Sequence, residues 1–144
     1  MKRLMGTSND VALTILRVVL GVVFFAHGAQ KMLGWFGGFG FHGTMGAFTQ
    51  MGMPAALAFL IICTEFFGGL GLIFGLLTRI AAFGVGCLMI GAIFMVHMPN
   101  GFFMNWMGSQ KGEGIEYHLL VLAMAGALLL RGAGAFSLDR ALAK

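Results

Sequence analysis

Seven ionisable side chains lie within or at the ends of the apolar segments of this sequence, and their chemistry is the first indication of what the protein does. They are Arg17, His27, Lys31, Glu65, His97, Glu116 and His118. Inside a lipid bilayer an ionisable group costs about 2.5–3.5 kcal/mol on insertion scales, so such groups usually face a bundle interior or a cavity. Imidazole and carboxylate groups in a cavity can hydrogen-bond a ligand and exchange protons with it.

These groups differ in how deep they lie in the apolar segments. Five of them fall at segment ends that we assign to one side of the membrane: His27, Lys31, His97, Glu116 and His118. His27 and Lys31 share one helix face, because they are four residues apart. Glu65 lies near the middle of the second segment, beneath the others. We therefore expect a polar pocket that opens outward, with Glu65 as the candidate for proton handling.

The candidates for ligand binding are His27, Lys31, Glu65, Glu116 and His118. Glu116 and His118 are separated by about 200° around a regular helix, so only one of them faces inward, and we expect it to be Glu116. Lys31 and Glu116 are expected to neutralise each other, and His27 or His118 to hydrogen-bond Glu65 or its neighbours. A structural alternative is that the same groups clamp the helices together and bind no ligand.

Histidine and methionine suggest a second chemistry, because imidazole and thioether groups bind copper(I) and haem iron. No M-x-x-M or H-x-x-x-H pattern organises these residues in the sequence. Cys63 and Cys87 stand alone and form no C-x-x-C motif, which argues against a zinc site or a thioredoxin-like pair. We favour no metal or haem site, and His97 and His42 are the remaining candidates for one.

Four apolar segments must position these groups. The 144-residue chain is 59% hydrophobic and only 10% charged, whereas soluble domains carry about 25% charged residues. A bilayer span needs about 20 apolar residues. We predict one all-α domain over 1–144, an integral membrane four-helix bundle with helices over about 11–32, 54–77, 79–98 and 115–131. The nine basic residues are too few and too scattered for a nucleic-acid partner, so the expected surroundings are a lipid bilayer.

The distribution of lysine and arginine predicts the orientation. Four spans place both termini on one side of the membrane, and that side holds Lys2, Arg3, Arg79, Arg131, Arg140 and Lys144. The other side holds only Lys31 and Lys111. Because positively charged loops stay in the cytoplasm, we expect both termini there (N-in/C-in). Arg17 is able to snorkel toward the same side.

The two outward links are rich in glycine and aromatic residues. Residues 33–53, between the first two helices, carry no charge, and residues 99–114 form the second link. Each link contains one tryptophan, Trp35 or Trp106, as expected for an aromatic belt at the membrane interface. In a functional interpretation, the same aromatic loops form a lid over an apolar ligand.

Several short motifs of glycine and polar residues follow one another along residues 12–142. In chain order they are Arg17-x-x-x-Gly21, His27-Gly28-x-x-Lys31, Glu65-x-x-Gly68-Gly69, Gly75-Leu76-x-Thr78-Arg79, Gly114-x-Glu116-Tyr117 and Gly132-x-Gly134-x-x-Ser137-Leu138-Asp139. This succession resembles the DoxX family. The resemblance implies a small four-helix protein of the inner (cytoplasmic) membrane of bacteria or archaea. Relatives in that family include membrane subunits of a thiosulfate:quinone oxidoreductase.

The resemblance also implies a role. The family-like polar positions are Arg17, His27, Lys31, Glu65, Arg79 and Glu116. By this likeness the chain is a quinone-interacting component of a membrane oxidoreductase system, and quinone is the expected cofactor. The sequence contains no evident cofactor-binding segment and no redox-active cysteine pair. A soluble or membrane oxidoreductase subunit is therefore the expected partner.

Two other functions stay open. The chain can be a non-catalytic membrane scaffold that recruits a soluble redox partner, or, as a less favoured alternative, a metal- or solute-binding membrane protein. Whether it is itself an enzyme is not decided by these residues. If it is one, it is an oxidoreductase subunit that acts on or through quinone. Self-association into a homo-oligomer is compatible with so small a bundle.

Overall fold

The computed structural model describes residues 5–143, and within that range it contains helices and loops without strands. The helices are α2 (Val11–Leu33), α3 (Gly40–Gln50), α4 (Ala55–Cys63), α5 (Gly69–Phe74), α6 (Thr78–Ala92), α7 (Glu116–Arg131) and α8 (Leu138–Leu142). A π-helical turn, η2 (Thr64–Gly68), joins α4 to α5, and a second, η3 (Ile93–His97), extends α6. Short 3-10 turns cover Trp35–Gly37 and Met98–Asn100.

Three helical stretches are long and apolar enough to cross a bilayer: Val11–Leu33, Ala55–Phe74 and Thr78–Asn100. Large apolar side chains project outward from them; Ile15 is 61% exposed and Phe94 is 66% exposed. Lipid is the medium that accommodates such surfaces, so the chain is a multi-pass membrane protein. The fourth predicted span corresponds to α7, which has 16 residues and is about 24 Å long, less than the ~30 Å hydrocarbon core.

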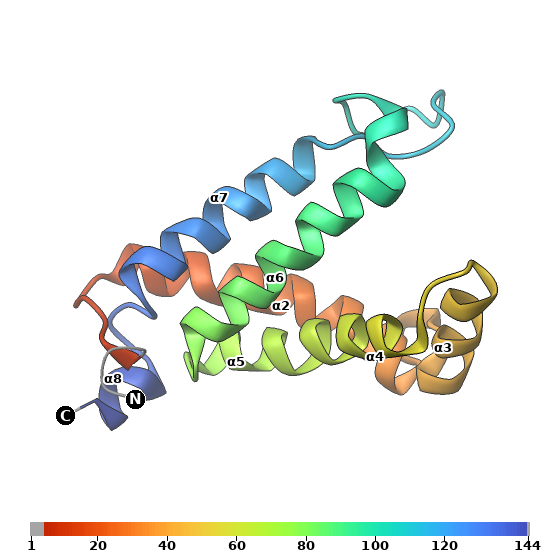
Figure 1. The fold of residues 1–144 in the computed structure, drawn as a ribbon. Helices are drawn as coiled ribbons and strands as arrows, with labels where there is room; N and C mark the ends of the chain where they lie inside the picture. The colour runs from red at the N-terminus through yellow and green to blue at the C-terminus, as the bar shows by residue number, and fades with distance from the viewer. Residues whose placement is uncertain (1–4, 144) are drawn as a thin grey trace.

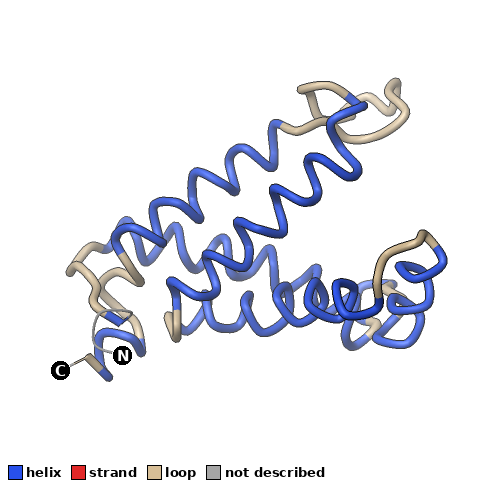
Figure 2. The backbone as a smooth tube through the Cα atoms, viewed as in Figure 1, coloured by secondary structure: helices blue, strands red, loops and turns tan. Residues whose placement is uncertain are grey.

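The helices form two pairs that meet at one end and diverge at the other (Figure 1). In the first pair α2 packs along η2 and α5, and in the second α6 packs against α7. The two ends of the described chain, residues 5 and 143, lie at the joined end, whereas α3 and the loop after Asn100 lie at the open end (Figure 2). The buried core, which includes Leu20, Phe24, Leu72, Val85 and Leu128, fills the region where the pairs meet.

Glycine allows the backbones of the first pair to touch. A Cβ atom on Gly28 would lie 2.4 Å from the backbone nitrogen of Phe66, and one on Gly69 would lie 2.4 Å from that of Phe25. Any side chain at either position would force the helices apart. Since lipid gives helices no hydrophobic reason to associate, such close van der Waals contact is what holds this pair together.

Arg17 connects the two pairs at the joined end. Its side chain is 1% exposed and donates from Nε to the carbonyl oxygen of Ala133 at 2.9 Å and from Nη2 to that of Phe136 at 2.6 Å. Nη1 donates to the last carbonyl groups of α5, those of Leu72 and of Ile73. Arg17 thus reaches toward the end of the molecule that holds the termini, but its guanidinium is buried among carbonyl groups there and does not reach the surface. Carbonyl groups at a helix end lack intrahelical partners, and a guanidinium with five donors satisfies several of them at once.

Asp139 completes this joint from α8. Its carboxylate accepts hydrogen bonds from the backbone nitrogen of Leu77 at 2.7 Å and from that of Thr78 at 2.9 Å, which are the first donors of α6. The turn before α6 has Gly75 and Leu77 in left-handed conformations, with φ of 68° and 50°. The second predicted helix consequently ends at Phe74, three residues before the expected 77.

Residues 33–53, predicted as a link, contain a helix. This helix is α3, and it packs against α2 and α4 at the open end (Figure 1). Its sequence, GFHGTMGAFTQ, holds three glycines. Glycine is a poor helix former in a sequence-based estimate, which explains why composition indicated a loop.

Replacing Arg17 by methionine should destabilise the fold. Four carbonyl oxygens lose their donor, and each buried unsatisfied group costs about 1–3 kcal/mol. We expect Arg17→Met to lower the thermal unfolding midpoint in detergent by many degrees. Arg131→Met, at an exposed arginine of α7, is the matched control and should leave the midpoint nearly unchanged. Equal midpoints for the two variants would contradict the assigned role of Arg17.

Candidate functional site

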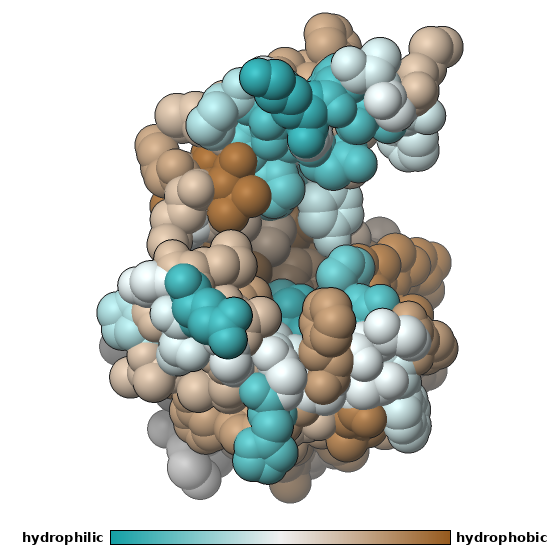
Figure 3. Space-filling view, turned by 90° about the vertical axis from the view of Figure 1, so that its right-hand side faces the viewer, coloured by the Kyte–Doolittle hydropathy of each residue, from teal (hydrophilic) through white to brown (hydrophobic). Residues whose placement is uncertain are grey.

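A cleft of about 440 Å³ lies between the two helix pairs. Its polar wall is formed by His27, Glu65, His97, Glu113, Tyr117 and His118, which come from α2, η2, η3, the loop after Asn100 and α7. Its apolar wall is formed by Val23, Phe24, Leu88, Met89, Ala92 and Met104. Figure 3, which views the open end, shows a hollow between the two halves with hydrophilic residues on both sides of it. The cleft therefore combines a small number of polar groups with an apolar surface.

His27 projects from α2 into this cleft. Its Nδ1 lies 2.9 Å from the carbonyl oxygen of Val23, one turn earlier in the same helix. A carbonyl oxygen can only accept, so Nδ1 carries the proton of the neutral ring. The second nitrogen, Nε2, is then a hydrogen-bond acceptor that is free to meet a ligand.

His97 and His118 meet across the second helix pair. Their ring centroids are 4.1 Å apart with an interplanar angle of 43°. Nδ1 of His97 donates to the carbonyl oxygen of Glu113 at 2.9 Å. His118 is only 4% exposed, and although the backbone of Gly114, one turn earlier, approaches its ring, the buried Nδ1 has no partner with hydrogen-bond geometry among residues 5–143. A buried polar atom without a partner is rare in proteins and calls for an explanation.

His118, and not Glu116, is the inward-facing residue at the start of α7. Glu116 instead turns toward the preceding loop, where Oε1 accepts from the backbone nitrogen of Met104 at 2.8 Å and from Nε1 of Trp106 at 3.3 Å. The expectation that Glu116 faces inward is thus wrong. Glu116 is the first residue of α7, and a carboxylate at this position can order the loop that leads into the helix through charge-assisted hydrogen bonds.

Glu65 forms an ion pair with Lys31, which was expected to pair with Glu116. Nζ of Lys31 lies 2.5 Å from Oε2 of Glu65, and the two side chains are 22% and 8% exposed. Glu65 stands in the π-helical turn η2 and lines the cleft, whereas Lys31 approaches it from α2. A buried carboxylate is costly without a partner, and Lys31 supplies that partner at the edge of the cleft. π-Helical turns occur frequently at functional sites.

Sequence reasoning missed two cleft residues, Glu113 and Tyr117. Tyr117 belongs to the motif Gly114-x-Glu116-Tyr117, but an aromatic residue in an apolar segment does not stand out. Glu113 lies in the second link, and its backbone oxygen receives the hydrogen bonds of His97 and of Asn100. Its acidic side chain directly before the motif was the available signal.

The other candidates, Trp35, Trp106 and His42, are not among the residues that line the cleft. Trp35 stacks edge-on against Phe25 with centroids 6.4 Å apart, and Trp106 is 86% exposed; neither of these indoles belongs to the cleft lining. His42 is exposed on α3. Within residues 5–143, no group of three or more histidine, cysteine, aspartate or glutamate side chains is arranged to hold a metal ion.

Comparisons with known proteins agree on one family. The DoxX family profile matches residues 12–98. The chain is 32% identical to the putative oxidoreductase CatD of Bacillus subtilis, over 94% of this chain and 90% of that protein. It is 31% identical to the inner membrane protein YqjF of Escherichia coli, over 94% and 95% of the two chains. It is 30% identical to the uncharacterized membrane protein Rv3486 of Mycobacterium tuberculosis, over 99% and 88%. No solved structure matches the chain.

The ion pair of Lys31 and Glu65 predicts an asymmetric response to substitution. Lys31→Met leaves a buried carboxylate without a partner, at a cost of up to about 3–5 kcal/mol. Glu65→Gln should cost less, because Lys31 is the more exposed partner and can reach the membrane interface. The double variant should recover part of the loss of Lys31→Met. Thermal unfolding in detergent measures all three, and equal effects of the two single variants would contradict the pairing.

Proposed function

Because the chain belongs to the DoxX family, we propose that it is a quinone-interacting component of a membrane oxidoreductase system, with the cleft as its binding site. One relative carries the name putative oxidoreductase, which supports the redox part of this proposal. The observation that carries the binding part is the cleft itself. It presents a buried imidazole nitrogen without a partner, on His118, beside an apolar wall.

The cleft residues fit a quinone in size and in chemistry. Its volume of about 440 Å³ lies within the roughly 300–1,000 Å³ of small-molecule sites. Leu88, Met89 and Val23 offer a surface for the ring. His118 can donate from Nδ1 to a ligand oxygen, whereas Nε2 of His27 can accept from a hydroxyl group of the reduced ring. A ligand oxygen at Nδ1 of His118 would also remove the cost of leaving that buried atom unpaired.

A bound quinone supplies two-electron chemistry that is coupled to protons, and the chain supplies the groups that handle the protons. In this proposal His27 exchanges a proton at Nε2 and His118 at Nδ1. Glu65, held by Lys31, lies at the edge of the same cleft and receives or returns a proton at its free oxygen, Oε1. The electrons come from an oxidoreductase subunit that binds to this chain in the membrane or at its surface.

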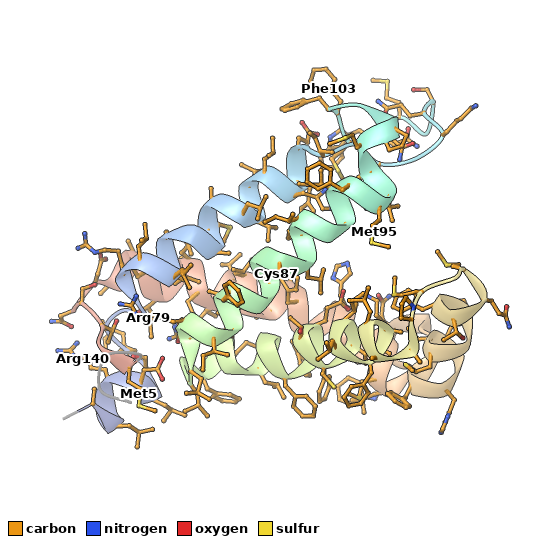
Figure 4. All side chains as sticks on the ribbon, in the orientation of Figure 1. Met5, Arg79, Cys87, Met95, Phe103 and Arg140 are labelled. Carbon is orange, nitrogen blue, oxygen red and sulfur yellow. The ribbon has the colours of Figure 1, made fainter. Side chains whose placement is uncertain are left out.

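We further propose that α7 is a fourth span and that the joined end lies in the cytoplasm, in an inner membrane like that of the Escherichia coli relative. Figure 4 places Arg79 and Arg140 at the joined end, and Met95 and Phe103 at the open end. Arginine is retained on the cytoplasmic side of membranes. The cleft in this orientation opens toward the outer leaflet.

A scaffold that recruits a soluble redox partner is the second candidate function. The loop after Asn100 favours it, because Phe103, Trp106 and Met107 are 66%, 86% and 93% exposed. An exposed apolar patch of this kind marks a contact with either protein or membrane. In the scaffold, the polar groups of the cleft would serve only to connect the helices.

Quinone content of the purified protein tests the binding proposal. We expect extraction in native lipid, followed by mass spectrometry, to recover a quinone in a stoichiometric amount from the wild type. His27→Ala should lose most of it, because the substitution removes the Nε2 acceptor that this ring offers to the ligand. The matched control is His42→Ala, at an exposed histidine of α3, which should retain the quinone. Protein without quinone in all three preparations would favour the scaffold.

Labelling of single cysteines tests the orientation. In a background without Cys63 and Cys87, a membrane-impermeant maleimide should label Met107→Cys in intact cells, because this residue is highly exposed at the open end. Leu142→Cys, on α8 at the joined end, should be labelled only after the membrane is opened. The reverse pattern would place the cleft on the cytoplasmic side.

A further inference from the structure

Two histidines of the cleft have the same hydrogen-bond geometry. Nδ1 of His27 lies 2.9 Å from the carbonyl oxygen of Val23, and Nδ1 of His97 lies 2.9 Å from that of Glu113. Neither carbonyl can donate, so in both neutral rings the proton is on Nδ1 and the lone pair is on Nε2. The fold therefore sets the tautomer of both rings, and both offer an acceptor to the cleft.

The carboxylates of the cleft add further acceptors. Oε2 of Glu65 is occupied by Nζ of Lys31, and Oε2 of Glu113 accepts the backbone nitrogen of Asn105 at 2.5 Å. Each carboxylate retains a second oxygen, Oε1, and an ionised carboxylate cannot donate. Among the described side chains that line the cleft, the groups that can donate are the hydroxyl of Tyr117 and the ring of His118. Acceptors thus outnumber donors on the polar wall.

We propose that the cleft selects the reduced form of its ligand, a hydroquinone with two hydroxyl groups, over the oxidised quinone. This inference rests on the function proposed above. The hydroxyl groups of a hydroquinone donate, and they match Nε2 of His27 and of His97. The carbonyl groups of a quinone only accept, so against the same wall they leave ligand and protein atoms unpaired. Sites built for one hydrogen-bonding pattern discriminate strongly against ligands that lack it.

Selective binding has a consequence for the ligand's redox potential. A site that binds the hydroquinone more tightly than the quinone stabilises the reduced state of the bound couple. The midpoint potential of the bound couple is therefore higher than that of the free couple. Each tenfold preference corresponds to about 30 mV for a two-electron couple.

Binding of the two redox forms can be compared directly. The full chain is placed in lipid nanodiscs and titrated by calorimetry without oxygen, once with a benzoquinone that carries a short alkyl tail and once with its hydroquinone. We expect the hydroquinone to bind at least about tenfold more tightly. Equal affinities, or tighter binding of the quinone, would overturn the inference and leave the proposed function standing. Failure of both forms to bind would overturn both proposals.

Substitution of the histidines tests whether they set the preference. His27→Gln and His97→Gln each replace an acceptor nitrogen by an amide that also donates. Each variant should bring the ratio of the two dissociation constants toward one, chiefly by improving the binding of the quinone. His42→Gln, outside the cleft, should keep the wild-type ratio. A ratio that stays at the wild-type value in both cleft variants would show that these histidines do not select the redox form.

Discussion

The buried guanidinium of Arg17 joins segments that are distant in the sequence, and the arrangement of the two helix pairs depends on it. It satisfies carbonyl groups at the end of α5 and in residues 133–136, while Asp139 satisfies the first donors of α6. A bilayer offers no water to such groups, so the protein must supply their partners. The helix pairs are consequently fixed together at this end, and they diverge toward the other, which leaves the cleft between them.

The polar groups of the membrane interior divide into two sets with different surroundings. At the joined end, Arg17 and Asp139 each have several hydrogen-bond partners and hold the helices together. In the cleft the groups are only partly satisfied. Glu65 is paired with Lys31, and His27 and His97 each use one ring nitrogen in a hydrogen bond. The buried Nδ1 of His118 lacks a partner within residues 5–143. Buried atoms without a partner also occur at the joined end, on Ser8, Thr78 and Arg79, but the unused capacity of the open end borders the cleft, where a ligand can meet it.

This division gives the proposed function its physical content. A rigid joint positions α2 and α7 so that His27 and His118 face the same cleft, and apolar residues of α6 form the remaining wall. In the proposed function the chain binds a ring molecule, orients its oxygen atoms and exchanges protons with it, and electron transfer is left to another subunit. In the proposed selectivity, the hydrogen bonds at Nδ1 of two histidines determine which nitrogen faces the ligand.

The sequence by itself determined the membrane environment, the helical class and the approximate helix bounds, since long apolar runs leave a chain in lipid few alternatives to helices. It also singled out His27, Glu65 and His118 as candidate site residues, because an ionisable group in such a run is conspicuous. Only the tertiary structure decided their partners. Hydropathy carries no information about which helix faces meet, so the pairing of Lys31 with Glu65, and the inward position of His118 in place of Glu116, depended on the close contact of α2 with η2 and on where α7 begins. The cleft also depends on the tertiary structure, because it exists only where two helix pairs held together at one end diverge at the other.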